Sequence, residues 1–181
     1  MKLLIASDIH GDINSADFVL STFKNEGCDR LLLLGDLLYF GPRNTLTESY
    51  DPQSVIKLLN DNKNIIMAVR GNCDCEVDQM VLDFPILADY ICLSLDGLTV
   101  YATHGHKYNT DNPLPLCKGD ILLHGHTHVL KCEGFGNGNF YLNPGSPTYP
   151  KENNPKTYML YENRCFTVKD FSGNIIFTKQ F

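Results

Sequence analysis

Near its start the chain reads Lys2-Leu3-Leu4-Ile5-Ala6-Ser7-Asp8-Ile9-His10-Gly11-Asp12. The apolar run from Lys2 to Ala6 predicts a buried strand, because a polar, glycine-containing segment typical of a loop follows it. Asp8 and His10 stand two residues apart just beyond the strand, so both side chains can point the same way and grip one ion. This pairing of a short apolar run with polar residues at its end is repeated along the chain.

Four further apolar runs end in the same way. They are Leu31 to Leu34 before Gly35-Asp36, Ile65 to Val69 before Arg70-Gly71-Asn72-Cys73-Asp74, Leu98 to Thr103 before His104-Gly105-His106, and Ile121 to Leu123 before His124-Gly125-His126-Thr127-His128. All six histidines lie in these polar clusters. Ligands of open α/β sheets bind beyond the carboxyl ends of the strands, so we expect the clusters to share one site.

Segments whose apolar residues have the spacing of a helix separate the first three runs. Ala16, Val19, Leu20 and Phe23 lie on one face of a helix, and a second helix is expected after Pro52. Strands that alternate with helices predict parallel pairing with right-handed crossovers. The first half of the chain therefore reads as α/β.

The second half has the pattern of antiparallel strands. Residues 90–95 and 98–103 flank Asp96-Gly97, a type I′ hairpin signal, and further strands are expected at 140–142, 158–161, 165–169 and 175–178. We expect a more antiparallel sheet behind the α/β half. No linker or repeat divides the chain, so residues 1–181 are expected to form a single domain.

Composition narrows the function classes. The 181 residues carry a net charge of −6 and contain no basic run, which disfavours a protein that grips a nucleic-acid backbone. The seven cysteines are odd in number and scattered, as is typical of a reducing compartment. No apolar segment is long enough for a signal peptide or a membrane span, so we predict a cytoplasmic protein without a membrane partner.

Imidazole, carboxylate and amide groups make up the candidate donor set: Asp8, His10, Asp36, Asn72, His104, His126 and His128. Such donors suit Mn, Fe, Zn, Ni or Co rather than a cysteine-rich structural zinc site. Seven donors exceed what one tetrahedral ion takes and suit two ions, with Asp36 as the natural bridge. Taken singly, such a cluster is more often a turn, a cap or a hydrogen-bonded histidine than a metal site; the convergence of the clusters favours a metal site.

The charge of such a site indicates its substrate. Two divalent ions, offset by Asp8, Asp36 and a bridging hydroxide, leave a net charge of about +1, which favours an anion such as a phosphate ester. A metal-bound water, its pKa lowered to about 7, supplies the nucleophile.

The motifs resemble those of the calcineurin-like metallophosphoesterase superfamily: Asp8-Ile9-His10, Gly35-Asp36, Gly71-Asn72-Cys73-Asp74, His104-Gly105 and Gly125-His126-Thr127-His128. Finer features at 41–44, 69–74, 103–106 and 143–146 are similar to a YfcE-type branch of small bacterial phosphodiesterases. The resemblance implies an α/β fold with a two-sheet β sandwich flanked by helices, a Mn-preferring dinuclear site, and hydrolysis of phosphodiesters rather than monoesters by a bridging hydroxide.

The resemblance also implies how the ligands divide between the ions. Asp8, His10, Asp36 and His128 would hold one ion, and Asp36, Asn72, His104 and His126 the other. The superfamily usually has histidine at position 73, where it stabilises the transition state or protonates the leaving group. Cys73 carries no positive charge and is a poorer proton donor, so it reads either as a catalytic position with reduced activity or as a small packing residue.

Other residues near the motifs have weaker signals. Asp74 is a supporting candidate, and Arg43, in a Gly-Pro loop, is a possible substrate contact. Arg70 reads as an anion contact or as a partner of a loop carboxylate. His106 and His124 need not be ligands, and residues 143–146 suggest a tight turn beside the site.

Three other functions remain open at this stage. One is a non-catalytic, Vps29-like protein-binding scaffold on the same fold, and another is a nuclease of the same superfamily, disfavoured by the charge. A third is a hydrolase of cyclic or dinucleotide phosphates. The expected partner is a small phosphodiester substrate without a stable nucleic acid complex. The resemblance also suggests a homo-oligomer, to which exposed strands or Phe181 would contribute.

Overall fold

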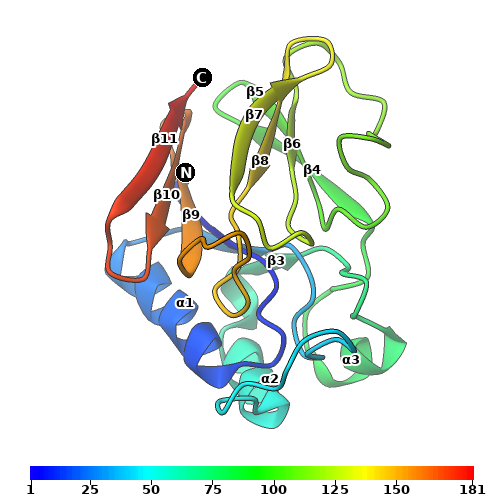
Figure 1. The fold of residues 1–181 in the computed structure, drawn as a ribbon, viewed down its shortest axis with the longest axis vertical. Helices are drawn as coiled ribbons and strands as arrows, with labels where there is room; N and C mark the ends of the chain where they lie inside the picture. The colour runs from blue at the N-terminus through cyan, green and yellow to red at the C-terminus, as the bar shows by residue number, and fades with distance from the viewer.

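The protein folds into two β-sheets packed face to face, with a layer of helices against the outer face of the first sheet (Figure 1). This is a computed structural model that describes residues 1–181. The first sheet has the strand order β11-β10-β9-β1-β2-β3 and the second β4-β5-β6-β8-β7. The expected α/β class with a two-sheet sandwich and flanking helices is confirmed.

The first half of the chain builds the parallel part of the first sheet. Its elements are β1 (Leu3–Ala6), α1 (Ile13–Asn25), β2 (Arg30–Leu33), α2 (Pro52–Asp61), a 3-10 turn (Lys63–Ile65) and β3 (Ile66–Ala68). β1 pairs parallel with β2, and β2 with β3, as the alternation of strands and helices predicts. Asp12 begins α1 by accepting a hydrogen bond from the Ser15 amide, and Pro52 lies in the first turn of α2.

The second half is divided between the two sheets. It forms α3 (Glu76–Val81), β4 (Tyr90–Leu95), β5 (Leu98–Thr103), β6 (Ile121–Leu123), β7 (Lys131–Phe135), β8 (Asn139–Asn143), β9 (Thr157–Glu162), β10 (Cys165–Asp170) and β11 (Ile175–Gln180). Asp96 and Gly97 both have positive φ between β4 and β5, which confirms the hairpin.

The expectation of a more antiparallel sheet behind the α/β half is wrong in two respects. β9 pairs antiparallel with β1 and so brings β10 and β11 into the first sheet. In the second sheet β6 pairs parallel with both β5 and β8. Short apolar runs show that a strand is buried but not which neighbour it pairs with, so the pattern left this choice open.

Two hydrophobic cores follow from the alternation of side chains along β1 and β2. Leu4, Leu31 and Leu33 face the helices and pack with Val19 and other residues of α1 and α2. Leu3, Ile5 and Leu32 face the opposite way and pack between the sheets, beside Val100 and Ile121. Strands buried on both faces explain why these runs are almost continuously apolar.

The apolar residues that are exposed near the C-terminus are not those named from the sequence. Phe181, offered from sequence as an oligomer contact, packs edge-on against Phe140 and Phe166 of the same chain. Ile175 and Ile176 of the edge strand β11 are exposed instead. None of the helices has the length and hydrophobicity needed to cross a lipid bilayer.

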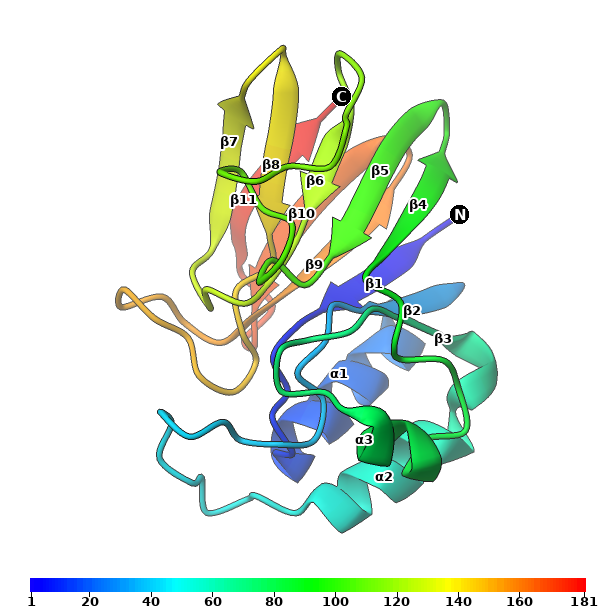
Figure 2. The same cartoon turned by 90° about the vertical axis from the view of Figure 1, so that its right-hand side faces the viewer.

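The loops that follow β1, β2, β3, β5 and β6 carry the polar clusters identified in the sequence. Figure 2 shows the second sheet above the helical layer, with these loops in the region between them. Parallel strands β1, β2 and β3 end at a common edge, and β5 and β6 end beside each other in the facing sheet. The topology thus brings residues from distant parts of the chain to one place.

Candidate metal centre

The carboxylate of Asp8 lies among the imidazoles of His10 and His128. The Nε2 atoms of His128 and His10 are 3.3 and 3.7 Å from Asp8 Oδ1. The two Nε2 atoms are themselves 3.3 Å apart. All three side chains are buried, and their donor atoms form one compact group that could hold a metal ion.

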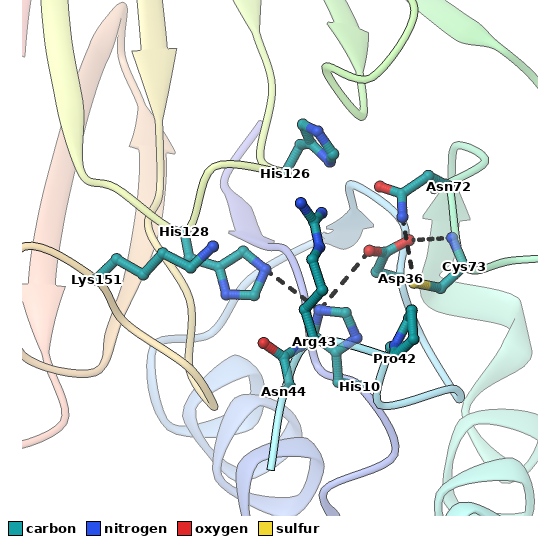
Figure 3. A pocket seen from close by; sticks show the side chains of 11 residues that line it. His10, Asp36, Pro42, Arg43, Asn44, Asn72, Cys73, His126, His128 and Lys151 are labelled. Carbon is teal, nitrogen blue, oxygen red and sulfur yellow. Dashed lines mark hydrogen bonds and ion pairs between the residues drawn. The ribbon is translucent and has the colours of Figure 1, made fainter.

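Asp36 connects this group to a second one. Its Oδ2 is 3.7 Å from His10 Nε2 and 3.4 Å from His104 Nε2, so it faces both groups. His104 Nε2 is also 3.0 Å from Asn72 Oδ1 and 3.2 Å from His126 Nδ1. The structure therefore brings together all seven donors proposed from the sequence. Figure 3 shows five of these donors: His10, Asp36, Asn72, His126 and His128.

Backbone carbonyls set the orientation of three of the imidazoles. The Nδ1 atoms of His10, His104 and His128 lie 2.7, 2.6 and 2.8 Å from the carbonyl oxygens of Tyr39, Leu34 and Tyr149. A carbonyl only accepts, so each Nδ1 must donate, and in the neutral ring Nε2 is then an unprotonated acceptor. This arrangement is typical of histidines that ligate a metal through Nε2.

A cation between these groups would satisfy atoms that otherwise lack partners. The unprotonated Nε2 atoms of His10 and His128 face each other and cannot hydrogen-bond in the neutral state. Asp8 Oδ1 is buried without a hydrogen-bond partner, whereas Oδ2 accepts the His126 amide. Buried acceptors of this kind are costly unless a positive charge meets them, so the donor set fits divalent metal ions.

The pKa values show how strongly the carboxylates and histidines interact. Burial raises the pKa of Asp8 and Asp36, but hydrogen bonds and charges from the neighbouring histidines lower both pKa values below their usual range. Burial lowers the pKa of His104, yet Asp36 and Asp8 together raise that pKa to about 9. Burial lowers the pKa values of His10 and His126. The two carboxylates thus remain negative in this buried cluster and attract positive charge.

Five of the donor residues have a strained backbone. Their φ angles are positive, at 61° for Asp8, 52° for His10, 54° for Asp36, 66° for His126 and 59° for His128. Each such residue costs about 1–3 kcal/mol unless the surroundings enforce it. Because strained residues cluster at functional sites, the strain at these donor positions indicates that their geometry serves a function.

Glycines give the donor loops room to approach each other. A Cβ atom on Gly71 would lie 2.1 Å from Asp36 Oδ1, and one on Gly125 would lie 1.8 Å from the Ser7 hydroxyl and 2.6 Å from Asp8 Oδ2. No larger residue fits at either position without displacing a carboxylate of the cluster. The glycines of the Gly-Asn and Gly-His motifs are therefore needed for close packing of the site.

Asp74 supports the Asp36 loop from below. Its carboxylate accepts the backbone amides of Asp36, Leu37 and Gly71 at 2.8, 2.9 and 2.7 Å. Burial raises its pKa to about 6, while these N–H donors oppose the rise. Asp74 does not line the cavity, so it acts as a positioning residue, which fits the supporting role expected from the sequence. Arg70 pairs with Glu76 at 3.3 Å.

A turn from the second sheet holds the Asp8 loop from the other side. Ser146 Oγ donates to the Asp8 carbonyl at 3.0 Å, and Thr148 Oγ1 donates to the Ile9 carbonyl at 2.8 Å. Asn143 Nδ2 donates to the Gly125 carbonyl at 2.9 Å. The 143–146 segment thus shapes the site through the backbone, as expected from the sequence.

A cavity of about 160 Å³ opens onto the donors. Cys73 and Arg43, both proposed from the sequence, line it, as do Asn44 and Lys151, which sequence reasoning missed (Figure 3). Lys151 lies beyond the 143–146 segment and belongs to no motif that could reveal it. His106 and His124 do not line this cavity, and burial lowers the pKa of each to about 4.

Cys73 occupies a position beside Asp36. Its backbone amide donates to Asp36 Oδ1 at 2.8 Å, and its thiol lies 3.2 Å from Asn72 Nδ2. Burial and the charge of Asp36 raise the pKa of the thiol well above its usual range. The side chain lies at the edge of the cavity, and a raised pKa disfavours a thiolate nucleophile there.

Comparisons with known proteins find relatives that cover nearly the whole chain. Phosphodiesterase YfcE of Escherichia coli K12 is 44% identical over 168 residues, which cover 93% of this chain and 91% of YfcE. The structure of the E. coli YfcE phosphoesterase superposes with a TM-score of 0.95 at 42% identity, covering 99% of this chain and 98% of that one.

More distant relatives share the architecture. Phosphodiesterase MJ0936 of Methanocaldococcus jannaschii is 26% identical over 135 residues, covering 71% of this chain and 74% of that protein. Vacuolar protein sorting 29 of Cryptosporidium parvum shares the fold, with a TM-score of 0.63 at 18% identity and coverage of 99% and 97%. The family model of the calcineurin-like phosphoesterase superfamily domain matches residues 1–164. The chain therefore belongs to the calcineurin-like phosphoesterase superfamily.

Proposed function

We propose that this protein is a phosphodiesterase that works with two divalent metal ions. Asp8, His10, Asp36 and His128 would hold one ion, and Asp36, Asn72, His104 and His126 the other. The observation that supports this most directly is the convergence of carboxylate oxygens and unprotonated imidazole nitrogens on a buried space. Mn is our first choice of metal, and Fe, Zn, Ni or Co also suit these donors.

Metal ions in this position would lower the pKa of a shared water so that it serves as the nucleophile, and would neutralise charge on the phosphoryl oxygens. The chain's own residues supply the frame for that chemistry. Asp36 faces both donor groups, which suits it to bridge them. Carbonyl partners keep the imidazoles in a single tautomer, and Arg43 at the cavity adds positive charge that attracts an anionic substrate.

The scaffold alternative fits the observations less well. Vps29 proteins share the fold with this chain, but a scaffold has no need of a complete set of metal donors, five of them buried and five with a positive φ. The 44% identity to a phosphodiesterase over most of the chain also favours an enzyme. We propose a small phosphodiester as the substrate and no stable nucleic acid complex, since the chain has a net charge of −6.

The direct test compares a diester with a monoester. Metal-stripped protein is expected to hydrolyse neither bis(p-nitrophenyl) phosphate nor p-nitrophenyl phosphate. Addition of Mn²⁺ should restore cleavage of the diester at a rate at least about tenfold above that of the monoester, as expected when only one phosphoryl charge state fits the site. Protein that demonstrably binds Mn²⁺ but cleaves neither ester would favour the scaffold function.

The Cys73→His variant should raise turnover on diesters with poor leaving groups. A histidine at the cavity edge can donate a proton to a departing alkoxide, an effect worth about 10²-fold or more, whereas the thiol is a poorer proton donor. Nucleoside 2′,3′-cyclic phosphates provide the poor leaving group, and bis(p-nitrophenyl) phosphate provides one that needs no proton. Cys73→Ser is the matched control. Equal or lower rates on the cyclic phosphates would show that Cys73 only fills space.

The assembly state is proposed from the exposed edge of the first sheet. Ile175 and Ile176 leave apolar side chains on the edge strand β11, where a second copy of the chain could pair. We therefore propose a homo-oligomer, and light scattering coupled to size exclusion would determine its mass. Cytoplasmic localisation remains a prediction based on the cysteine content.

A further inference from the structure

Two cationic side chains at the cavity have no partner within the protein. Arg43 and Lys151 both line it, and their charged ends point inward from opposite loops (Figure 3). Six of the other basic residues form ion pairs within the chain: Lys2, Lys57, Lys63, Arg70, Lys107 and Lys169. In a protein with a net charge of −6, two unpaired cations beside one small cavity indicate an anionic ligand there.

The loops that carry these cations are tied to each other and to the donor cluster. Tyr149 donates its hydroxyl to the Thr45 carbonyl at 2.8 Å, which joins the loop of Lys151 to the loop of Arg43. The Lys151 amide donates to the His128 carbonyl at 3.1 Å, and the Tyr149 carbonyl accepts from His128 Nδ1. The two loops that carry the cations are therefore held beside the donors, partly by the contact that orients His128.

The positive charge at the cavity exceeds what is needed to balance a simple phosphodiester. With the proposed ions, Asp8, Asp36 and a hydroxide, the cluster has a net charge of about +1, which the single negative charge of a phosphodiester balances. Arg43 and Lys151 then remain unbalanced. Only one of the eleven residues that line the cavity is hydrophobic, so the space beside the scissile group is built for polar rather than apolar substituents.

We infer that the substrate is a phosphodiester that carries a second phosphate group, and that Arg43 and Lys151 bind this second phosphate. The inference rests on the proposed function, because it concerns the specificity of the same site. Guanidinium and ammonium groups both bind phosphate oxygens through charge-assisted hydrogen bonds. Lys151 is thereby assigned a specificity role next to Arg43.

A matched pair of substrates tests the inference. Thymidine 5′-(p-nitrophenyl phosphate) and its 3′-phosphorylated form release the same p-nitrophenolate and differ only in the second phosphate. The wild-type enzyme with Mn²⁺ should prefer the phosphorylated form at least about tenfold in kcat/KM, as expected for one charge-assisted contact. Arg43→Gln and Lys151→Gln should each reduce that ratio by about the same factor. Lys156→Gln, an exposed lysine outside the cavity, should retain the wild-type ratio.

Binding gives a second readout that does not depend on turnover. Calorimetric titration should show that thymidine 3′,5′-bisphosphate binds about tenfold more tightly than thymidine 5′-phosphate, and that the difference disappears in Lys151→Gln. A wild-type ratio near one in both measurements, or variants that affect both members of the pair equally, would overturn the inference. Hydrolysis of both diesters at equal rates would overturn the inference and leave the phosphodiesterase proposal intact. Loss of all hydrolysis with selective binding retained would overturn the phosphodiesterase proposal but not the assignment of Arg43 and Lys151 to a second phosphate.

Discussion

Replacing Asp36 with asparagine will reduce metal-dependent cleavage of bis(p-nitrophenyl) phosphate by about 10³-fold or more. The bound metal would stabilise charge in the transition state by several kcal/mol, and this stabilisation depends on the Asp36 carboxylate that holds the metal. Asp36 Oδ2 is the carboxylate oxygen that faces both His10 Nε2 and His104 Nε2, at 3.7 and 3.4 Å. Asparagine keeps the shape and the oxygen that accepts the Cys73 amide, but it removes the negative charge. Steady-state rates and metal content by mass spectrometry measure the two effects.

The same experiment separates a catalytic effect from misfolding. Asp61→Asn, an exposed change on α2, should leave both the rate and the metal content unchanged. The Asp36→Asn protein should retain wild-type secondary structure by circular dichroism while binding less metal. Full activity in that variant would mean that Asp36 bridges nothing and that the two donor groups work independently or not at all.

The donors of the cluster could be predicted from sequence because each stands directly after an apolar run. A strand end fixes where its next residues lie, so Asp8, Asp36 and His104 were placed by topology before any contact was known. Their strained backbone was not predictable, since positive φ at a non-glycine residue depends on tertiary contacts such as those of Ser146 and Asp74.

Lys151 and the short elements escaped prediction for physical reasons. Lys151 reaches the cavity only because Tyr149 and the Lys151 amide tie its loop to His128, a contact that spans more than twenty residues and leaves no periodic pattern. Helix α3 buries no residue completely, and β7 is largely exposed, so neither has the apolar periodicity on which sequence analysis depends. The pairing of β9 with β1 is likewise a tertiary choice between equally buried strands.

Replacing Asp74 with alanine is expected to lower the free energy of unfolding by about 3–5 kcal/mol, because a buried acceptor is removed from three donors. The amides of Asp36, Leu37 and Gly71 all donate to this one carboxylate, and alanine leaves them without partners in a dry environment. Urea unfolding of the variant and the wild type, both stripped of metal, measures the loss without a contribution from bound ions.

Two further variants show whether the loss comes from those three hydrogen bonds. Asp74→Asn keeps one carbonyl oxygen as an acceptor and should cost about half as much as alanine, since part of the amide set stays satisfied. Asp78→Ala removes a carboxylate that accepts only the Cys75 amide at the start of α3, and should cost about 1 kcal/mol. If Asp74→Ala cost no more than Asp78→Ala, water would be replacing the carboxylate. Because Asp74 also holds the Asp36 amide, Asp74→Ala should bind metal more weakly than Asp78→Ala, which couples the stability of this loop to the chemistry of the site.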